Sequence, residues 1–239
     1  MSELEIDAVV FDVLGTLVDE PAGIRAGIRA LDPTLDEPGT GRLLTLWQRH
    51  IERECRSILD GSRSYVTSEV LDREAAGLVA GAAGVDDPAA VAALALAGRR
   101  LPPWPDTVAG LARLAERFPL IGLSNASRTA LLGLNAHAGL RWHQVLSAGD
   151  ARTYKPDPAV YGLAVAASGG PPERLLMVAA HAWDLRGAQA VGLRTAYVAR
   201  PVGDPPTATD RFDLYADGLA DLAGQLRTWT KSPRTGDGP

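Results

Sequence analysis

Carboxylate, amide, hydroxyl and ammonium side chains stand at four points of this 239-residue sequence where covalent catalysis could use them. Asp12 follows a short apolar run, Ser124 and Asn125 follow a second run, and Asp184 lies shortly after a third. Lys155 lies just before a stretch with helical spacing. A nearby cation stabilises the ionised form of a carboxylate nucleophile and holds it in line for attack. A carboxylate such as Asp12 beside a cation such as Lys155 is a pair that such chemistry could use.

Each of these residues also has a purely structural explanation. An Asp at the end of a strand often caps a helix or a turn, and Ser-Asn after a strand often forms a turn. Lys155 precedes a Pro and fits an exposed loop, while His181 fits a surface position or a hydrogen-bonded place in the core. All four groups fall at the same edge of the predicted sheet, which favours a shared function over four separate structural roles.

The choice of lysine at position 155 carries information of its own. Only two of the 24 Lys and Arg residues are Lys, and the other is Lys231 near the C-terminus. A compact ammonium can hold one oxygen of a carboxylate and leave the other free, whereas the Arg fork tends to hold both. A lysine in an arginine-rich sequence therefore favours a specific contact between Lys155 and Asp12.

The apolar runs that precede the polar residues predict an α/β fold with a Rossmann-like parallel sheet. The runs typical of buried strands are 8–11, 120–123, 175–180 and 195–198. The stretches with helical spacing between them are 107–117, 128–137, 158–167 and 184–191. Alternation of strand and helix indicates right-handed βαβ units, whose functional side chains gather at the carboxyl ends of the strands.

A helical insertion interrupts this alternation after the first strand. Its predicted helices are 22–31, 41–59, 67–80 and 88–99. We predict a core formed by residues 1–17 and 101–230, a helical cap over 18–100, and a disordered tail over 231–239. The proline-rich segment Leu101-Pro-Pro-Trp-Pro-Asp106 is predicted to be the stiff linker that returns from the cap to the core.

Composition limits the classes of function. The net charge is -5, with 46% apolar residues and one cysteine, Cys55, so the sequence predicts a globular cytoplasmic protein without disulfides. No basic cluster is present to bind nucleic acid or an anionic membrane. The first residues do not show the pattern of a signal peptide, and no apolar stretch approaches the ~20 residues of a membrane span. A small-molecule substrate is the expected partner, and a homodimer is the commonest assembly on base rates.

Four segments, taken in order, resemble the motifs of the haloacid dehalogenase superfamily. They are Phe11-Asp-Val-Leu-Gly-Thr-Leu17, Leu123-Ser-Asn125, Tyr154-Lys-Pro-Asp157 and Val178-Ala-Ala-His-Ala-Trp-Asp184. Each motif is weak alone, but their order and spacing make the resemblance specific. In that superfamily a helical cap follows the first motif, which is where the helical insertion lies. The resemblance implies that Asp12 is the nucleophile.

Position 14 separates the reactions that the superfamily performs. Its phosphatases carry a second Asp two residues after the nucleophile, which protonates the departing alcohol. Leu14 stands there in this sequence, and a halide, being a very weak base, leaves without a proton. The fourth motif offers only Asp184 as a carboxylate for magnesium. The resemblance thus implies a cofactor-independent reaction with no metal site.

Among superfamily members, the sequence is most similar to the type II 2-haloacid dehalogenases, which share Trp183-Asp184 and Tyr161. The resemblance implies an ester between Asp12 and a short 2-haloalkanoic acid, which water then hydrolyses. The implied catalytic residues are Asp12, Thr16, Lys155, His181 and Asp184. The implied substrate-binding residues are Leu14, Gly15, Gln48, Ser124, Asn125, Tyr161 and Trp183. The alternatives are a magnesium-dependent phosphatase of small metabolites and a non-catalytic binding protein of the same fold.

The sequence also departs from this subgroup. A Tyr usually stands at the position of Leu14, and an Arg usually follows the Leu-Trp pair where Gln48 lies here. Arg49 cannot simply replace that Arg, because a shift of one residue turns a side chain by about 100° around a helix. His181 replaces an asparagine. It fits either a general base for ester hydrolysis, since imidazole titrates near neutral pH, or a space-filling neighbour of Asp184.

Overall fold

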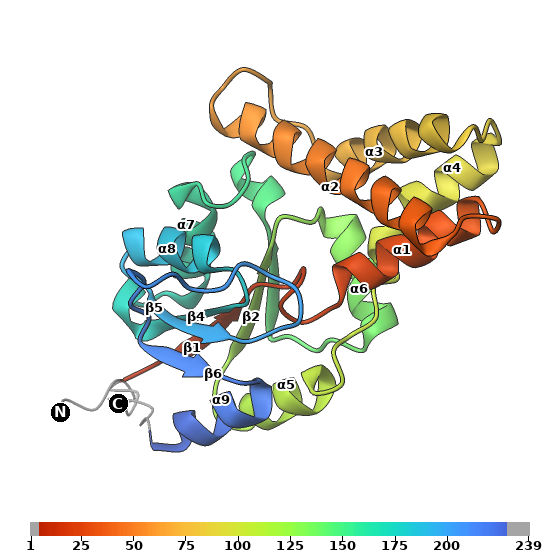
Figure 1. The fold of residues 1–239 in the computed structure, drawn as a ribbon. Coiled ribbons are helices and arrows are strands. Elements are labelled where there is room, and N and C mark those ends of the chain that lie inside the picture. Colours follow the sequence, from red (N-terminus) through yellow and green to blue (C-terminus); the bar gives the residue numbers. More distant parts are fainter. Residues whose placement is uncertain (1–4, 229–239) are drawn as a thin grey trace.

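The computed structural model describes residues 5–228, and its strands form one parallel six-stranded sheet in the order β3-β2-β1-β4-β5-β6 (Figure 1). The strands are β1 (Ala8–Phe11), β2 (Leu120–Ser124), β3 (Gln144–Ser147), β4 (Leu175–Ala179), β5 (Arg194–Val198) and β6 (Leu214–Ala216). The direction of strand succession reverses between β1 and β4, and ligands of open α/β sheets bind at such a switch point. The predicted α/β class is confirmed. The predicted tail, 231–239, lies outside the described residues.

Helices cover both faces of the sheet. On one face lie α5 (Thr107–Ala115), α6 (Arg128–Ala138) and α9 (Leu219–Gln225), and on the other lie α7 (Pro158–Ser168) and α8 (Ala182–Ala190). The strands supply both cores because successive side chains point to opposite faces. Val9 and Phe11 of β1 pack in the first core, whereas Ala8 and Val10 pack in the second. This two-sided burial explains the continuous apolar run of residues 8–11.

The insertion after β1 is helical, as predicted. It contains α1 (Glu20–Leu31), α2 (Glu37–Leu59), α3 (Ser68–Ala83) and α4 (Pro88–Ala95), followed by a short 3-10 helix, Ala97–Arg99. Local chemistry starts these helices, because Asp19, Asp36 and Asp87 each accept a backbone N–H at the N-terminus and a proline follows within two residues. Figure 1 shows these helices as a layer beside the sheet-containing body. We keep the proposed boundaries of the cap at residues 18 and 100.

The two segments that join the cap to the core run side by side. The N–H of Asp19 donates to the carbonyl of Pro102 at 2.8 Å, and the N–H of Trp104 donates to Leu17 at 3.1 Å. Val18 and Pro103 form an antiparallel bridge between these bonds. The outgoing and returning chains therefore brace each other directly behind the loop that follows β1.

Several elements differ from the sequence prediction. β3, β6 and α9 were not predicted, α2 begins at Glu37 rather than residue 41, and α8 begins at Ala182 rather than residue 184. β3 and β6 lie at the two edges of the sheet and are partly exposed, so neither has the uniform apolar run of a central strand. Among the described helices, none is long and apolar enough to cross a membrane.

Candidate active site

Asp12 stands at the carboxyl end of β1, and two donors hold its carboxylate. Its backbone N–H donates to Val178 of β4 at 3.0 Å, which extends the strand pairing to this residue. The Thr16 hydroxyl donates to Oδ2 at 2.6 Å, and the Lys155 ammonium donates to Oδ1 at 3.0 Å. The Thr16 hydroxyl in turn accepts the N–H of Ala180 at 2.9 Å. Each carboxylate oxygen keeps a second lone pair for other chemistry.

Lys155 bridges Asp12 and Asp184. Its ammonium donates to Asp184 Oδ2 at 2.8 Å, and the Tyr161 hydroxyl donates to Asp184 Oδ1 at 2.6 Å. Asp184 and Tyr161 have no exposed surface, and the Lys155 side chain is 1% exposed. Solvent therefore screens these charge pairs only weakly.

The charges of this triad set the protonation of Lys155. Burial by itself lowers the pKa of Lys155, but the attraction of Asp12 and Asp184 outweighs it, so the pKa lies above the ordinary value. Burial raises the pKa of Asp184, and the Lys155 ammonium opposes that rise. Lys155 is thus a fixed cation between two carboxyl groups, the arrangement that keeps a carboxylate nucleophile in place.

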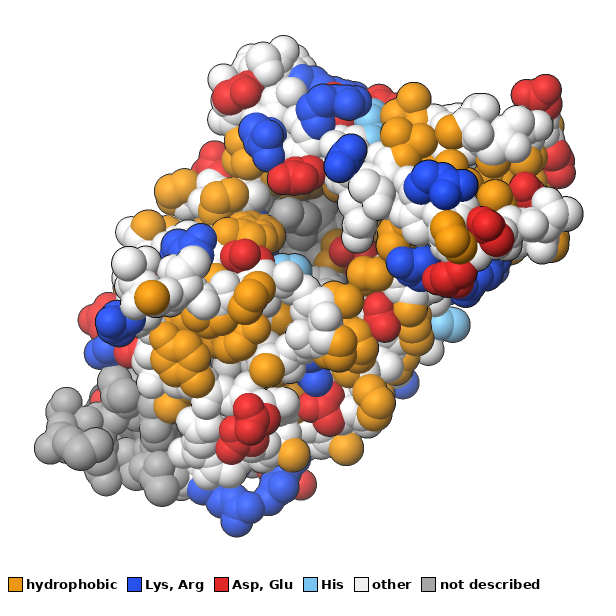
Figure 2. Space-filling view, in the orientation of Figure 1, with side chains coloured by type: hydrophobic (Ala, Val, Ile, Leu, Met, Phe, Trp, Pro, Cys, Tyr) orange, Lys and Arg blue, Asp and Glu red, His pale blue; other side chains and the backbone are white. Residues whose placement is uncertain are grey.

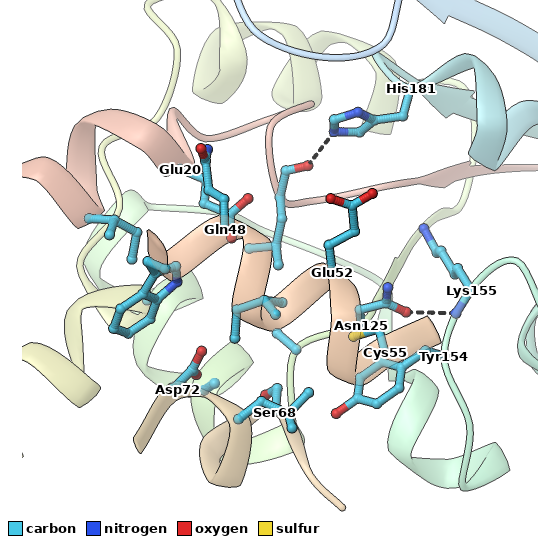
Figure 3. A pocket seen from close by; sticks show the side chains of 18 of the residues that line it. Glu20, Gln48, Glu52, Cys55, Ser68, Asp72, Asn125, Tyr154, Lys155 and His181 are labelled. Atoms are coloured by element: carbon cyan, nitrogen blue, oxygen red, sulfur yellow. Dashed lines mark hydrogen bonds between the residues drawn. The ribbon is translucent and has the colours of Figure 1, made fainter. Parts of the chain in front are cut away.

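Ser124 and Asn125 shape the loop after β2. The Asn125 side-chain oxygen accepts the backbone N–H of Lys155 at 2.8 Å, which fixes the lysine backbone beside the site (Figure 3). The Ser124 hydroxyl accepts the N–H of Ala126 at 3.1 Å and is fully buried. Asn125 lines the cavity described below, and Ser124 does not.

Gly15 and His181 are in close contact. Gly15 has a φ of 77°, and a Cβ atom there would lie 2.6 Å from His181 Nε2, so both the backbone conformation and the space require glycine. His181 Nε2 lies 3.2 Å from the carbonyl oxygen of Leu14 (Figure 3). A carbonyl only accepts, so this bond places the proton on Nε2 and leaves Nδ1 as the basic nitrogen.

A cavity of about 580 Å³ lies between the cap and the carboxyl edge of the sheet. Figure 2 shows the molecule hollowed between these two parts. Seven predicted site residues line the cavity: Asp12, Leu14, Gln48, Asn125, Lys155, His181 and Trp183. The other five lie behind this surface: Gly15, Thr16, Ser124, Tyr161 and Asp184. Gln48 is exposed on α2, and Arg49 is exposed without lining the cavity.

Among the cap residues that line the cavity, three with a raised pKa were not among the predicted site residues: Glu20 at the start of α1, Cys55 of α2 and Asp72 of α3 (Figure 3). The pKa of Asp72 is raised to about 8, chiefly by burial and also by the nearby Glu20 and Glu69, while Arg99 and Arg73 oppose the rise. Burial likewise raises the pKa of Glu20 and raises that of the Cys55 thiol to about 12. Their positions on three helices gave no local signal in the sequence.

The arrangement suits attack by a carboxylate on a carbon atom whose leaving group needs no proton. Asp12 faces the cavity beside Leu14, which has no proton to donate. Hard cations prefer oxygen ligands, but Lys155 already bridges the two carboxylates and His181 already engages the Leu14 carbonyl. Within residues 5–228, no group of three or more His, Cys, Asp and Glu is arranged to hold a metal ion.

Comparisons with known proteins agree with this geometry. The family model for haloacid dehalogenase-like hydrolases matches residues 6–192. An (S)-2-haloacid dehalogenase from Xanthobacter autotrophicus is 36% identical over 200 residues, which cover 82% of this chain and 76% of the relative. The crystal structure of an L-2-haloacid dehalogenase matches with a TM-score of 0.84 at 34% identity, covering 93% of this chain and 99% of its own.

A further solved structure bears on the chemistry. It is an L-2-haloacid dehalogenase from Xanthobacter autotrophicus with chloropropionic acid covalently bound. It matches with a TM-score of 0.78 at 28% identity, and the match covers 93% of this chain and 98% of the other. From the fold, the site and these matches, the chain belongs to the haloacid dehalogenase-like hydrolase family.

Proposed function

We propose that this protein is a hydrolytic dehalogenase of short 2-haloalkanoic acids that works through an ester on Asp12. The observation that carries the proposal is the placement of Asp12, held by Thr16 and Lys155, on a cavity wall beside the apolar Leu14. A carboxylate nucleophile is present, and position 14, two residues further on, carries no acid that could protonate an alcohol. The covalently bound chloropropionic acid in a solved relative supports a covalent route.

In the first step, an Asp12 carboxylate oxygen attacks the carbon that bears the halogen. A carbon–oxygen bond forms while the carbon–halogen bond breaks, and the halide leaves with the bonding electron pair. Thr16 and Lys155 hold the carboxylate in line, which removes the entropic cost of finding that geometry. The attack inverts the configuration of the carbon.

In the second step, water attacks Cγ of the Asp12 ester. The resulting tetrahedral intermediate collapses by breaking the bond between Cγ and the ester oxygen, which releases the 2-hydroxy acid and regenerates the Asp12 carboxylate. One proton is released overall, with the halide as its counterion. Lys155 lies beside the Asp12 carboxyl group, where the negative charge of the intermediate develops. Asp184 holds the Lys155 ammonium, and the Tyr161 hydroxyl in turn holds Asp184.

Within this proposal, the positions of the residues and the subgroup resemblance support the remaining roles. Asn125, Gln48, Trp183 and Leu14 face the substrate from the cavity wall. Gly15 and Ser124 act from behind that wall by shaping the loops, and Tyr161 acts there by holding Asp184. His181 acts as a base only through Nδ1, since Nε2 is engaged by the Leu14 carbonyl. The reaction needs water and no cofactor, and a homodimer and a cytoplasmic location stay predictions.

Halide release from the enantiomers of 2-chloropropionate, measured with EDTA present, tests the proposal. We expect turnover that is insensitive to the chelator and that falls by roughly 10³-fold or more in Asp12→Asn, because the nucleophile is gone. Asp86→Asn, which changes an exposed acid of the cap, is the matched control and should leave the rate unchanged. Magnesium-dependent release of phosphate from phosphate esters, with no halide release, would contradict the proposal.

A single turnover in heavy-oxygen water distinguishes the covalent route from direct hydrolysis. The ester route places the water oxygen on Asp12, so a peptide containing residues 8–17 should gain mass while the first product molecule carries no label. Label found only in the product would mean that water attacks the substrate carbon directly.

A further inference from the structure

An arginine outside the cavity contacts the loop that follows the nucleophile. Arg200 lies just after β5, and its side chain is 7% exposed. Its Nε donates to the carbonyl oxygen of Thr16 at 2.8 Å, and its Nη1 donates to Asp106 Oδ1 at 2.8 Å. The guanidinium also lies over the ring of Trp104, 5.9 Å from its centre. Arg200 does not line the cavity, so it has no path to the substrate.

The neighbouring carbonyls of the same loop are held in the same way. The Trp104 indole donates to the carbonyl oxygen of Gly15 at 3.0 Å, and the Thr107 hydroxyl donates to that of Leu17 at 2.7 Å. Trp104 comes from the linker that returns from the cap, and Thr107 begins α5. Donors from separate parts of the chain thus fix consecutive carbonyls of this loop.

Thr16 connects this outer layer to the nucleophile. Its carbonyl accepts from Arg200, while its hydroxyl donates to Asp12 Oδ2 at 2.6 Å. Because peptide units are planar and a Thr side chain has few allowed rotamers, fixing the carbonyl limits where the hydroxyl points. We propose that Arg200 is a positioning residue for the nucleophile: by holding the carbonyl of Thr16 it keeps the Thr16 hydroxyl against Asp12.

The geometry explains why this position needs arginine. One planar guanidinium serves two acceptors, the Thr16 carbonyl and the Asp106 carboxylate, through different nitrogen atoms. Asp106 also compensates the buried positive charge, and its second oxygen accepts the N–H of Leu219 at 2.8 Å. A lysine could reach one acceptor but would not hold both in a fixed plane. Trp104 supports the guanidinium from the side through its ring.

Steady-state kinetics with 2-chloropropionate test this inference, which rests on the proposed function for its activity readout. Arg200→Lys should lower kcat by roughly 10- to 100-fold and change KM by less than about threefold, because misplacing a reacting group by about 1 Å costs about 10²-fold. Trp104→Phe keeps the ring but removes the donor to Gly15, and should lower kcat by a smaller factor. Arg194→Lys, on β5, alters a more exposed pair with Asp213 and is the matched control.

A double-mutant cycle separates positioning from general structural support. If Arg200 acts through Thr16, then Arg200→Lys added to Thr16→Val should lower kcat little further, because the hydroxyl it positions is already gone. Losses that multiply would overturn the inference, and so would a kcat for Arg200→Lys within twofold of wild type. If Arg200→Lys fails to fold, Trp104→Phe and Asp106→Asn go through the same cycle.

Hydrogen exchange gives a readout that does not need turnover. Arg200→Lys should speed amide exchange in residues 13–18 and leave α6 unchanged, whereas Arg194→Lys should change neither. Unchanged exchange in the loop would overturn the inference. A wild-type protein that releases no halide while Arg200→Lys still loosens the loop would contradict the proposed function and leave the positioning intact.

Discussion

The buried acids around the cavity differ in whether a cation accompanies them. Asp12 and Asp184 share the Lys155 ammonium, at 3.0 and 2.8 Å. Asp72 is half-buried and has no hydrogen bond or salt bridge within residues 5–228. A carboxyl group that loses water without gaining a partner favours its neutral form. The charge of Asp72 therefore destabilises the folded state.

Stability near pH 8 should depend on Asp72. Its pKa is about 8 in the folded chain, against about 3.9 when unfolded, so the folded state binds an extra proton between these values. Stability then falls as the pH rises through this window, by at most about 1.4 kcal/mol per pH unit from this group. Asp72→Asn removes that loss, and its stability gain over wild type, from urea unfolding, should grow from pH 5 to pH 8.

The exposed Asp86 provides the comparison for this measurement. Asp86→Asn should shift the unfolding free energy by a few tenths of a kcal/mol at most, with no trend across the same pH range. A gain for Asp72→Asn that is the same at pH 5 and pH 8 would show that the carboxyl does not titrate in this window.

The sequence motifs predicted the residues that pair around the nucleophile, but not the residues that support them through tertiary contacts. Asp12, Lys155 and Asp184 follow or flank predicted strands and helices, so a parallel sheet brings them together, as the structure does. Arg200 contacts Thr16 across 184 positions of sequence, and no periodicity relates the two. The cap acids, such as Asp72, face the cavity only because of how α1, α2 and α3 pack. Residues that act through tertiary contacts leave no local pattern.

Two helices of the cap differ in the hydrogen bonding of their N-terminal residues. Asp36 is the N-cap of α2, and its side chain accepts the N–H of Gly39 at 2.7 Å, whereas Thr67 is the N-cap of α3 and makes no such side-chain bond. Asp36→Ala should lower the unfolding free energy by about 1 kcal/mol, because it leaves a helix N–H without a partner. Thr67→Ala, at an exposed position, should cost only a few tenths.

Urea unfolding of both variants at one pH checks the difference between the two helix starts. Equal losses would show that the Asp36 bond contributes nothing beyond the properties of the residue itself. Far-UV circular dichroism of the folded variants should be unchanged, since α2 is a long helix whose buried side chains keep it in place.

The degree of burial determined which strands and helix ends could be predicted from the sequence. The central strands β1 and β4 are buried along their whole length and were predicted within one residue of their ends. β3 begins with two exposed residues, and β6 has three residues, so neither carries a distinctive apolar run. Helix starts were placed late where polar residues of the first turn, such as Glu37, precede the apolar stripe. At the edges of the sheet and the ends of helices, tertiary contacts determine the structure more than the local hydrophobic pattern does.

Across the whole molecule, the cap and the core share one apolar cluster. It contains Ile24 and Trp47 of the cap together with Leu131 and Leu176 of the core. We expect the two parts to unfold together, because exposing either one removes packing from the other. Differential scanning calorimetry should show one peak, with a ratio of van't Hoff to calorimetric enthalpy near 1. Two peaks, or a ratio far below 1, would mean that the cap melts by itself.

The path of the chain back from the cap limits how this scaffold can be recombined. Trp104 and Asp106 sit on that path, yet both contact groups behind the nucleophile. A chimaera that takes its insertion from another member should therefore be joined before Leu101, so that the native segment travels with the sheet. A crossover placed at Thr107 would replace Trp104 and Asp106 behind Gly15 and Thr16, and the foreign segment would then shift the nucleophile from outside the cavity.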